Sequence, residues 1–207
     1  MSGLLKCALV AAVLLLGAGS PASAQTIFQD DFESEQPGTP QITNYGSTPA
    51  FPSFANWDVT NGTVDLWDFY GSQNVDLDGS TGNAGKLSTK TALSLAPGNY
   101  TLSFTLGKNG TSNETVLVNV GTALPAQTIT HTGGGIPSPI PFAFTFNVAA
   151  ATSGKIEFDH LGGDNAGLVL DNVKLVRQAA VIPEPISLAL FGFGLAPLGA
   201  IIRRRRA

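Results

Sequence analysis

The chain is poor in cysteine, histidine and basic residues. Its single cysteine, Cys7, lies in an apolar N-terminal run, and its two histidines are His131 and His160. Because no thiol occurs after Cys7, the body of the chain has no disulfide framework and no thiolate nucleophile. The motifs Gly-x-Ser-x-Gly and His-Glu-x-x-His are also missing. We therefore predict no catalytic residue and no enzymatic activity.

Positive charge is scarce in the body of the chain. Residues 25–180 hold fourteen of the fifteen acids but only six of the eleven Lys and Arg residues, which gives them a charge near −8. Residues 25–85 contain nine acids and no Lys or Arg. Nucleic acid is excluded as a partner because nothing would neutralise its phosphates. A divalent cation fits this charge balance.

The first long apolar run is at the N-terminus. Cys7 to Gly17 is uninterrupted and follows Lys6, and the small residues Ala22 and Ala24 come shortly after it. A basic start, an apolar run and small residues in this order are typical of a secretory signal peptide. We predict that residues 1–24 are the signal peptide, that signal peptidase cleaves before Gln25, and that the chain is exported.

The second long apolar run is at the C-terminus. Residues 186–202 carry no charge, and as a helix they would span roughly 25 Å, close to the thickness of the hydrocarbon core. A buried helix of the main domain would instead show a polar stripe, which this run lacks. We predict a transmembrane helix over residues 186–202. It is held on the cytoplasmic side by Arg203, Arg204, Arg205 and Arg206.

A short motif, Pro183-Glu184-Pro185, precedes that span. Together with the apolar span and the arginine cluster, it makes residues 181–207 resemble the PEP-CTERM sorting signal of Gram-negative, exopolysaccharide-producing bacteria. The resemblance implies processing near this motif by an exosortase, a membrane-embedded enzyme. It also implies a transient stay in the inner membrane, followed by release to the cell surface or extracellular matrix.

Between the two ends, residues 25–180 have the size of one domain. Apolar residues alternate with polar ones in several runs, separated by turns rich in Gly, Pro and Asn; the clearest are 100–106, 116–120, 142–148, 156–158 and 168–176. A period of two without a helical period predicts an all-β, antiparallel β-sandwich. Residues 36–54, rich in Pro, Ser, Thr and Gly, are predicted to form a long loop.

Four segments carry a second resemblance. Asp31-Phe32-Glu33, Trp57, the run Ala96 to Phe104 and the run Leu170 to Val173 occur in an order similar to that of galactose-binding-like jelly rolls and related carbohydrate-binding modules. The resemblance implies a jelly roll whose first and last strands lie together and often share a structural calcium ion. The matching ligands here are Glu33 and Asp171, with Asp31 nearby, completed by backbone carbonyls.

A hairpin is predicted around Asn61-Gly62, a dipeptide typical of two-residue turns. The register would place Trp57 on the core side and Asp58 directly opposite Asp65. Facing carboxylates repel unless a cation, a proton or a displacement separates them. A cation or sugar site, two solvated carboxylates and a different register all remain open. Residues 75–83 are predicted to be a turn, because they lack the spacing and the final Glu of an EF-hand loop. Residues 162–167 match only part of a Gly/Asp repeat and are likewise predicted to be a turn.

Trp67 and Tyr70 are the candidate ligand contacts. Trp67 has the parity of Asp65, opposite to Val64 and Leu66, so it is predicted to point away from the core. Exposed aromatic side chains mark binding surfaces. Tyr70, like Tyr45, is predicted in or near a flanking loop. The alternative is that a loop or the second sheet covers Trp67, which would make it a core residue.

Three functions follow from these features. The first is a non-enzymatic cell-surface or matrix protein whose sandwich binds exopolysaccharide or another matrix glycan. The second is a polysaccharide lyase or hydrolase on the same jelly roll, and the third is a purely architectural domain. A lyase needs a base and cationic groups that neutralise the substrate. With only six basic residues in the domain, the first function is favoured.

Overall fold

The computed structural model describes residues 23–35, 42–69, 71–132, 134 and 136–180. They belong to one compact unit, Ser23–Ala180. The predicted signal peptide, the Pro183-Glu184-Pro185 motif, the apolar span and the arginine cluster lie outside the described residues. Across the described part of the chain every regular element is a strand, and no helix there could cross a membrane. The prediction of an all-β domain is confirmed.

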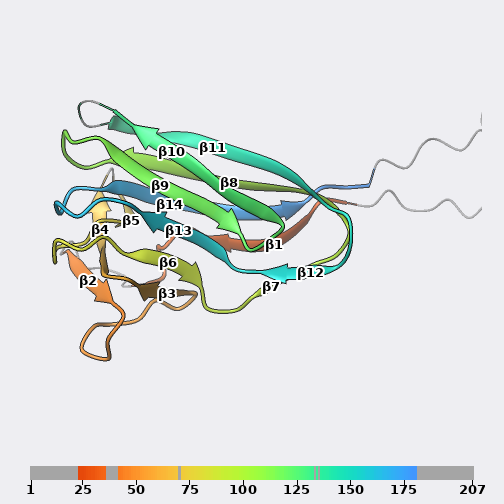
Figure 1. Cartoon of the computed structure of the whole chain (residues 1–207), viewed down its shortest axis with the longest axis horizontal. Coiled ribbons are helices and arrows are strands. Elements are labelled where there is room, and N and C mark those ends of the chain that lie inside the picture. Colours follow the sequence, from red (N-terminus) through yellow and green to blue (C-terminus); the bar gives the residue numbers. More distant parts are fainter. Residues whose placement is uncertain (1–22, 36–41, 70, 133, 135, 181–207) are drawn as a thin grey trace, which may run out of the picture. The chain divides into compact units, whose positions relative to one another are not determined.

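Two antiparallel sheets form the domain (Figure 1). The seven-stranded sheet contains, in spatial order, β11 (Ile136–Val148), β8 (Gly98–Lys108), β14 (Leu168–Arg177), β5 (Ser72–Asp76), β4 (Thr63–Phe69) and β2 (Thr43–Gly46), with β1 (Gln25–Asp30) also paired to β14. The five-stranded sheet contains β10 (Leu124–His131), β9 (Glu114–Val120), β13 (Ile156–His160), β6 (Lys86–Thr89) and β3 (Trp57–Thr60). A small third sheet pairs β12 (Thr152–Gly154) with β7 (Leu93–Leu95).

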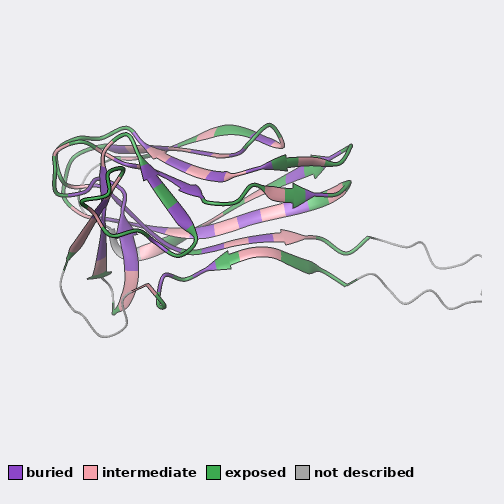
Figure 2. Cartoon of the chain, turned by 90° about the horizontal axis from the view of Figure 1, so that it is seen from below, coloured by how far each residue is buried: buried purple, intermediate pink, exposed green. Residues whose placement is uncertain are grey.

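The core lies between the two large sheets. In β8 the buried apolar residues Tyr100, Leu102, Phe104 and Leu106 alternate with less buried polar ones, as the period of two predicts. Burial also alternates along β9 (Figure 2). Phe104 of β8 meets Phe158 of β13 edge to face, with ring centroids 5.0 Å apart. This contact joins the two sheets, so the apolar faces pack against each other as in a β-sandwich.

The prediction of one long loop over residues 36–54 is wrong in part. Residues 43–46 form β2, which pairs with β4 and places Asn44 opposite Asp65. Tyr45 is 1% exposed, and its ring stacks on that of Phe54 with centroids 3.9 Å apart. Burying these two rings stabilises a strand in a segment whose composition is that of a loop, so tertiary packing overrides local propensity.

Candidate functional site

Asp58 and Asp65 lie in different sheets. Asp58 of β3 faces Ser88 of β6, whereas Asp65 of β4 lies between Asn44 and Asp76. The predicted hairpin, and with it the facing of Asp58 and Asp65, is therefore wrong. Trp57 is nevertheless a core residue as predicted, with 1% of its surface exposed.

The Asn61-Gly62 turn forms a corner between the sheets. Both residues have positive φ, 65° and 150°, which suits this dipeptide. The hydrogen bonds that a hairpin partner would make are taken by the loop after β5. Thr63 N–H donates to Asn83 O at 3.1 Å, and Thr63 O accepts from Gly79 N–H at 3.0 Å. Thr63 therefore pairs with the loop after β5 and not with β3, so the predicted hairpin register does not form.

A carboxylate pair does exist in β4 and β5, between Asp65 and Asp76. Asp65 accepts hydrogen bonds from Asn44 Nδ2 at 2.6 Å and Ser80 Oγ at 2.5 Å. Asp76 accepts from the Asp78 backbone N–H and from Asn109 Nδ2, both at 3.0 Å. Each carboxylate oxygen has a neutral donor, so polar neighbours offset the cost of burying the pair.

Burial raises the pKa of Asp76 to about 7, although the hydrogen bonds from Asn109 and Asp78 lower it. The charges of Asp65 and Asp78 add to the rise in this pKa. Asp76 is only 3% exposed. This carboxyl therefore exchanges its proton near neutral pH, where an ordinary aspartate is fully ionised.

The first and last strands lie side by side, as the second resemblance implies: β1 pairs with β14. Asp171 sits at an irregularity of β14 and accepts from the Asn172 N–H at 2.6 Å and from Ser72 Oγ at 3.3 Å. Burial raises the pKa of Asp171 to about 6, and Glu33 and Asp31 contribute to the rise. The negative charges of Glu33 and Asp31 thus act on Asp171.

Glu33 and Asp31 already have backbone donors. Glu33 Oε1 accepts from the Gln73 N–H at 2.9 Å, and Asp31 Oδ1 accepts from the Glu33 N–H at 3.4 Å. Within the described ranges, no group of three or more His, Cys, Asp or Glu side chains is placed to hold a metal ion. Calcium at Glu33, Asp171 and Asp31 stays a prediction.

Trp67 is half-buried in β4 and faces Asn74 of β5. Its neighbours Val64 and Leu66 are 0% and 3% exposed, so the side chains of opposite parity do form the core. The sequence left open whether Trp67 is an exposed ligand contact or a buried core residue. Its half-buried position lies between these two alternatives. Tyr70, the second predicted ligand contact, lies outside the described residues.

A cavity of about 480 Å³ lies where β2 ends and β3 begins. Twelve residues line it: Gly46, Ser47, Thr48, Pro49, Phe51, Pro52, Ser53, Phe54, Trp57, Asp58, Val59 and Thr60. Phe54 and Trp57 are buried in the core, whereas Phe51 is half-buried. The Phe51 ring packs against the backbone of Gly46, where a Cβ atom would lie 2.5 Å from its Cδ2. The cavity therefore combines aromatic walls with exposed hydroxyl groups.

Asp58 supplies the carboxylate of this cavity. Its side chain is 48% exposed, and Oδ2 lies 3.5 Å from Lys155 Nζ, itself 36% exposed. A solvent-exposed ion pair of this kind contributes little stability. The sequence singled out Asp58 because it was predicted to face Asp65, which it does not do. Phe51 was missed, because it lies in a Pro- and Ser-rich segment without alternation.

No protein-family model and no curated protein sequence matches this chain. Several solved structures are similar in arrangement. The carbohydrate-binding module CBM6cm-2 of Cellvibrio mixtus lichenase 5A, in complex with cellotriose, is 16% identical with a TM-score of 0.39, over 73% of this chain and 97% of that one. The K1 cleaved adhesin domain of Lys-gingipain from Porphyromonas gingivalis is 18% identical with a TM-score of 0.45, over 73% and 97%.

An enzyme is also among the similar structures. The exo-β-1,3-galactanase of Phanerochaete chrysosporium, with β-1,3-galactotriose, is 16% identical with a TM-score of 0.36. The match covers 75% of this chain but only 29% of the galactanase chain. All three TM-scores lie below 0.5, and the similarities assign neither a family nor a ligand to this protein.

Proposed function

We propose that this protein is an exported, non-catalytic β-sandwich that binds a neutral glycan in the cavity beside Phe51 and Asp58. The cavity is the observation that supports the proposal. Its volume of about 480 Å³ falls within the range of small-molecule sites, roughly 300–1,000 Å³. It is large enough for one or two sugar rings, so the bound unit is a short stretch of a longer polysaccharide.

The lining matches the two kinds of surface that a sugar presents. The C–H face of a pyranose ring packs on an aromatic ring, and Phe51 offers one at the cavity wall. Sugar hydroxyl groups need acceptors, and an ionised carboxylate such as Asp58 accepts several hydrogen bonds. Thr48, Ser53 and Thr60 add hydroxyl groups that both donate and accept.

The charge of the domain favours a neutral glycan. Residues 25–180 carry a charge near −8, which repels uronate- or sulfate-bearing chains. Asp58 also disfavours an acidic sugar, because the carboxylate of such a sugar would lie next to the Asp58 carboxylate in the cavity.

Binding without catalysis fits the lining better than hydrolysis does. Asp58 is the one titratable side chain among the described residues that line the cavity. Most glycoside hydrolases use a pair of carboxyl groups, one on each side of the glycosidic bond. A single carboxylate paired with Lys155 can hold a sugar hydroxyl but does not make such a pair.

Affinity electrophoresis in gels containing a soluble neutral glucan would test this proposal, with alginate as the acidic comparison. Replacing Asp58 with asparagine is expected to weaken retention about tenfold or more, because a hydrogen bond to a charged group contributes about 1.5–3 kcal/mol. Phe51→Leu, which keeps an apolar side chain but removes the ring, is expected to act in the same direction.

Asp68→Asn is the matched control, since Asp68 is an exposed acid of β4 outside the cavity. It is expected to retain wild-type binding. Loss of retention in Trp67→Ala with normal retention in Asp58→Asn would move the binding surface to β4. Stronger retention by alginate than by any neutral glycan would contradict the proposed ligand class.

We also propose that the C-terminal residues 181–207 are a sorting signal read by an exosortase. The supporting pattern is the Pro183-Glu184-Pro185 motif, the uncharged run and the terminal arginines, in that order. The signal peptide directs export, and the C-terminal span holds the chain in the inner membrane until processing. The sandwich then reaches the cell surface or matrix, where a glycan ligand is available.

Processing has a direct readout in the intact mass of the protein recovered from the cell surface. The mature species is expected to begin at Gln25 and to end near Pro183 to Pro185, so it lacks both the leader and the arginine-tipped tail. A variant that combines Pro183→Ala, Glu184→Ala and Pro185→Ala is expected to keep the tail attached. A stable wild-type surface form that still ends at Ala207 would refute the sorting proposal.

A further inference from the structure

Ionisable residues occupy core-facing positions at one end of the sandwich. Lys108 has the parity of Tyr100 to Leu106 in β8, Glu114 that of Val116 to Val120 in β9, and His160 that of Ile156 and Phe158 in β13. Lys108, Glu114 and His160 are 2%, 1% and 4% exposed, and Asp78, from the loop after β5, is 1% exposed. His131 of β10 faces Glu114 directly. We name these five residues the core-end cluster.

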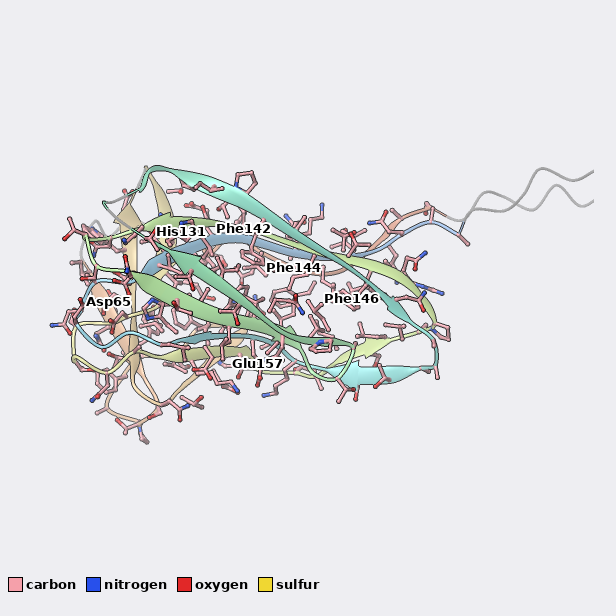
Figure 3. The ribbon with its side chains drawn as sticks, turned by 45° about the horizontal axis from the view of Figure 1, so that its top comes forward. Asp65, His131, Phe142, Phe144, Phe146 and Glu157 are labelled. Atoms are coloured by element: carbon pink, nitrogen blue, oxygen red, sulfur yellow. The ribbon has the colours of Figure 1, made fainter. Side chains whose placement is uncertain are left out.

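His131 is the outermost member of the cluster. Figure 3 shows it on β10 beside Phe142 of β11, at the end of the row formed by Phe142, Phe144 and Phe146. The rings of His131 and Phe142 meet edge to face, with centroids 5.7 Å apart. Burial lowers the pKa of His131, and Lys108 lowers it further. His131 is therefore neutral at neutral pH and gives Glu114 no counter-charge.

His160 is held in its neutral form by its backbone partners. Its Nδ1 accepts from the Gly162 N–H at 3.1 Å, and the Leu168 N–H lies 3.4 Å from Nε2. If both ring nitrogens carried a proton, the Nδ1–H group would point at the Gly162 N–H, and this hydrogen bond would be lost. Burial lowers the pKa of His160 despite the opposing charges of Asp78, Asp164 and Asp159. His160 thus cannot serve as the cation for a neighbouring carboxylate.

Glu114 is the member that is short of partners. Its Oε2 lies 3.5 Å from His160 Nε2, and its Oε1 is buried without a hydrogen-bond partner. Lys108 directs its Nζ to the carbonyl oxygen of Ser112. Asp78 Oδ1 and His131 Nε2 are likewise buried without a partner. An ionised glutamate in this position would leave a buried charge poorly compensated, which is costly.

The loops around the cluster tie it to the surface. Asp164 donates its backbone N–H to Asp78 Oδ2 at 3.0 Å, and its carboxylate accepts from Ser112 Oγ at 2.7 Å. Residues 109–113 and 161–167 are therefore linked to each other and to Asp78. Both loops also contact the cluster directly, because Ser112 O accepts from Lys108 Nζ and the Gly162 N–H donates to His160 Nδ1.

We propose that Glu114 binds a proton in the folded protein and that this proton closes the loops 109–113 and 161–167 over the end of the core. A protonated carboxyl removes the buried charge and turns one oxygen into a donor, and unpartnered acceptors are present in the same cluster. As the pH rises through neutrality the proton leaves, the glutamate charge returns, and opening of the two loops becomes more favourable. Closure of this end of the core is therefore favoured at mildly acidic pH.

The charges around Glu114 agree with this direction. Burial raises the pKa of Glu114 to about 7, and Asp164 and Asp78 raise it while Lys108 lowers it. The ordinary pKa of a glutamate is 4.5, so the closed state binds a proton between pH 4.5 and 7 that an open state does not. The stabilisation is complete below about pH 4.5 and is lost as the pH rises through about 7. Between pH 6 and pH 8 the opening equilibrium of these loops is expected to rise about tenfold.

Two measurements on the purified protein test the proposal. The carboxyl carbon of Glu114, followed by NMR, is expected to titrate near pH 7. Hydrogen exchange of residues 109–113 and 161–167, corrected for intrinsic rates, is expected to speed up about tenfold from pH 6 to pH 8. In Glu114→Gln, which has the same shape but cannot ionise, the corrected exchange is expected to be the same at both pH values.

Asp76→Asn tests the competing explanation, because burial also raises the pKa of Asp76 to about 7 and its carboxylate accepts hydrogen bonds from Asn109 of the first loop and from Asp78 of the cluster. It is expected to keep the pH-dependent exchange of both loops. Titration of Glu114 near 4.5, or a pH effect that persists in Glu114→Gln and vanishes in Asp76→Asn, would overturn the proposal. Recovery of slow exchange at pH 8 by calcium, but not by sodium at matched ionic strength, would also overturn it and make the cluster a cation site.

Discussion

Replacing Trp57 with alanine is expected to destabilise the domain by ~3–5 kcal/mol, a large part of the stability of a domain of this size. Trp57 is 1% exposed, and its ring contacts Phe28 edge to face at 5.2 Å and lies 5.9 Å from Phe32 and 6.1 Å from Phe158. The substitution leaves a cavity among these rings. It also removes the indole N–H that donates to Asp30 Oδ2 at 2.8 Å.

Urea unfolding followed by circular dichroism would measure this effect, since the transition midpoint falls with the free energy of unfolding. Trp67→Ala is the matched control, because Trp67 is half-buried in β4. It is expected to shift the midpoint much less. Equal shifts in the two variants would contradict the placement of Trp57 at the centre of the core.

Replacing Asp30 with alanine is expected to cost ~2–6 kcal/mol, although Asp30 is an acid in a strongly acidic domain. Its carboxylate is 6% exposed and accepts from the Phe32 N–H at 2.9 Å and from the Trp57 indole N–H at 2.8 Å. Alanine would leave both buried donors without an acceptor, at about 1–3 kcal/mol each. The Phe32 backbone, held at φ 58°, would also lose the bond that supports its turn.

The neighbouring acid supplies the control for this prediction. Asp31 is exposed, so Asp31→Ala is expected to change the free energy of unfolding by no more than about 0.5 kcal/mol. If removal of negative charge were the dominant effect, both variants would be stabilised alike. Asp30→Asn, which retains one acceptor oxygen, is expected to fall between wild type and Asp30→Ala.

The arrangement of β1 and β14 shows what a remote resemblance can predict. The resemblance implied that the first and last strands lie together, and β1 does pair with β14, although Asp31-Phe32-Glu33 follows β1 outside the strand. The resemblance did not predict that Asp171 would be buried with an Asn172 N–H and a Ser72 hydroxyl as donors. Those donors come from an irregularity in β14 and from a distant strand.

Part of the core-end cluster could have been predicted from the sequence. The alternation that identified the strands β8, β9 and β13 also assigns Lys108, Glu114 and His160 to their inward faces. What the pattern could not supply was their meeting at one end, because this depends on which strands are neighbours. Phe51 and its cavity had no such pattern, since the position of a loop is set by what it packs against.

The sequence by itself determined the strand character of the domain and the inward face of each long strand. Side chains on a strand alternate with a period of two, so local order is enough to assign these features. The tertiary structure alone decided that Asn61-Gly62 turns a corner between sheets, that Asp65 faces Asp76 rather than Asp58, and that Asp58 lines a cavity with Phe51. Each of these depends on hydrogen bonds or packing between segments far apart in the chain, which no local pattern encodes.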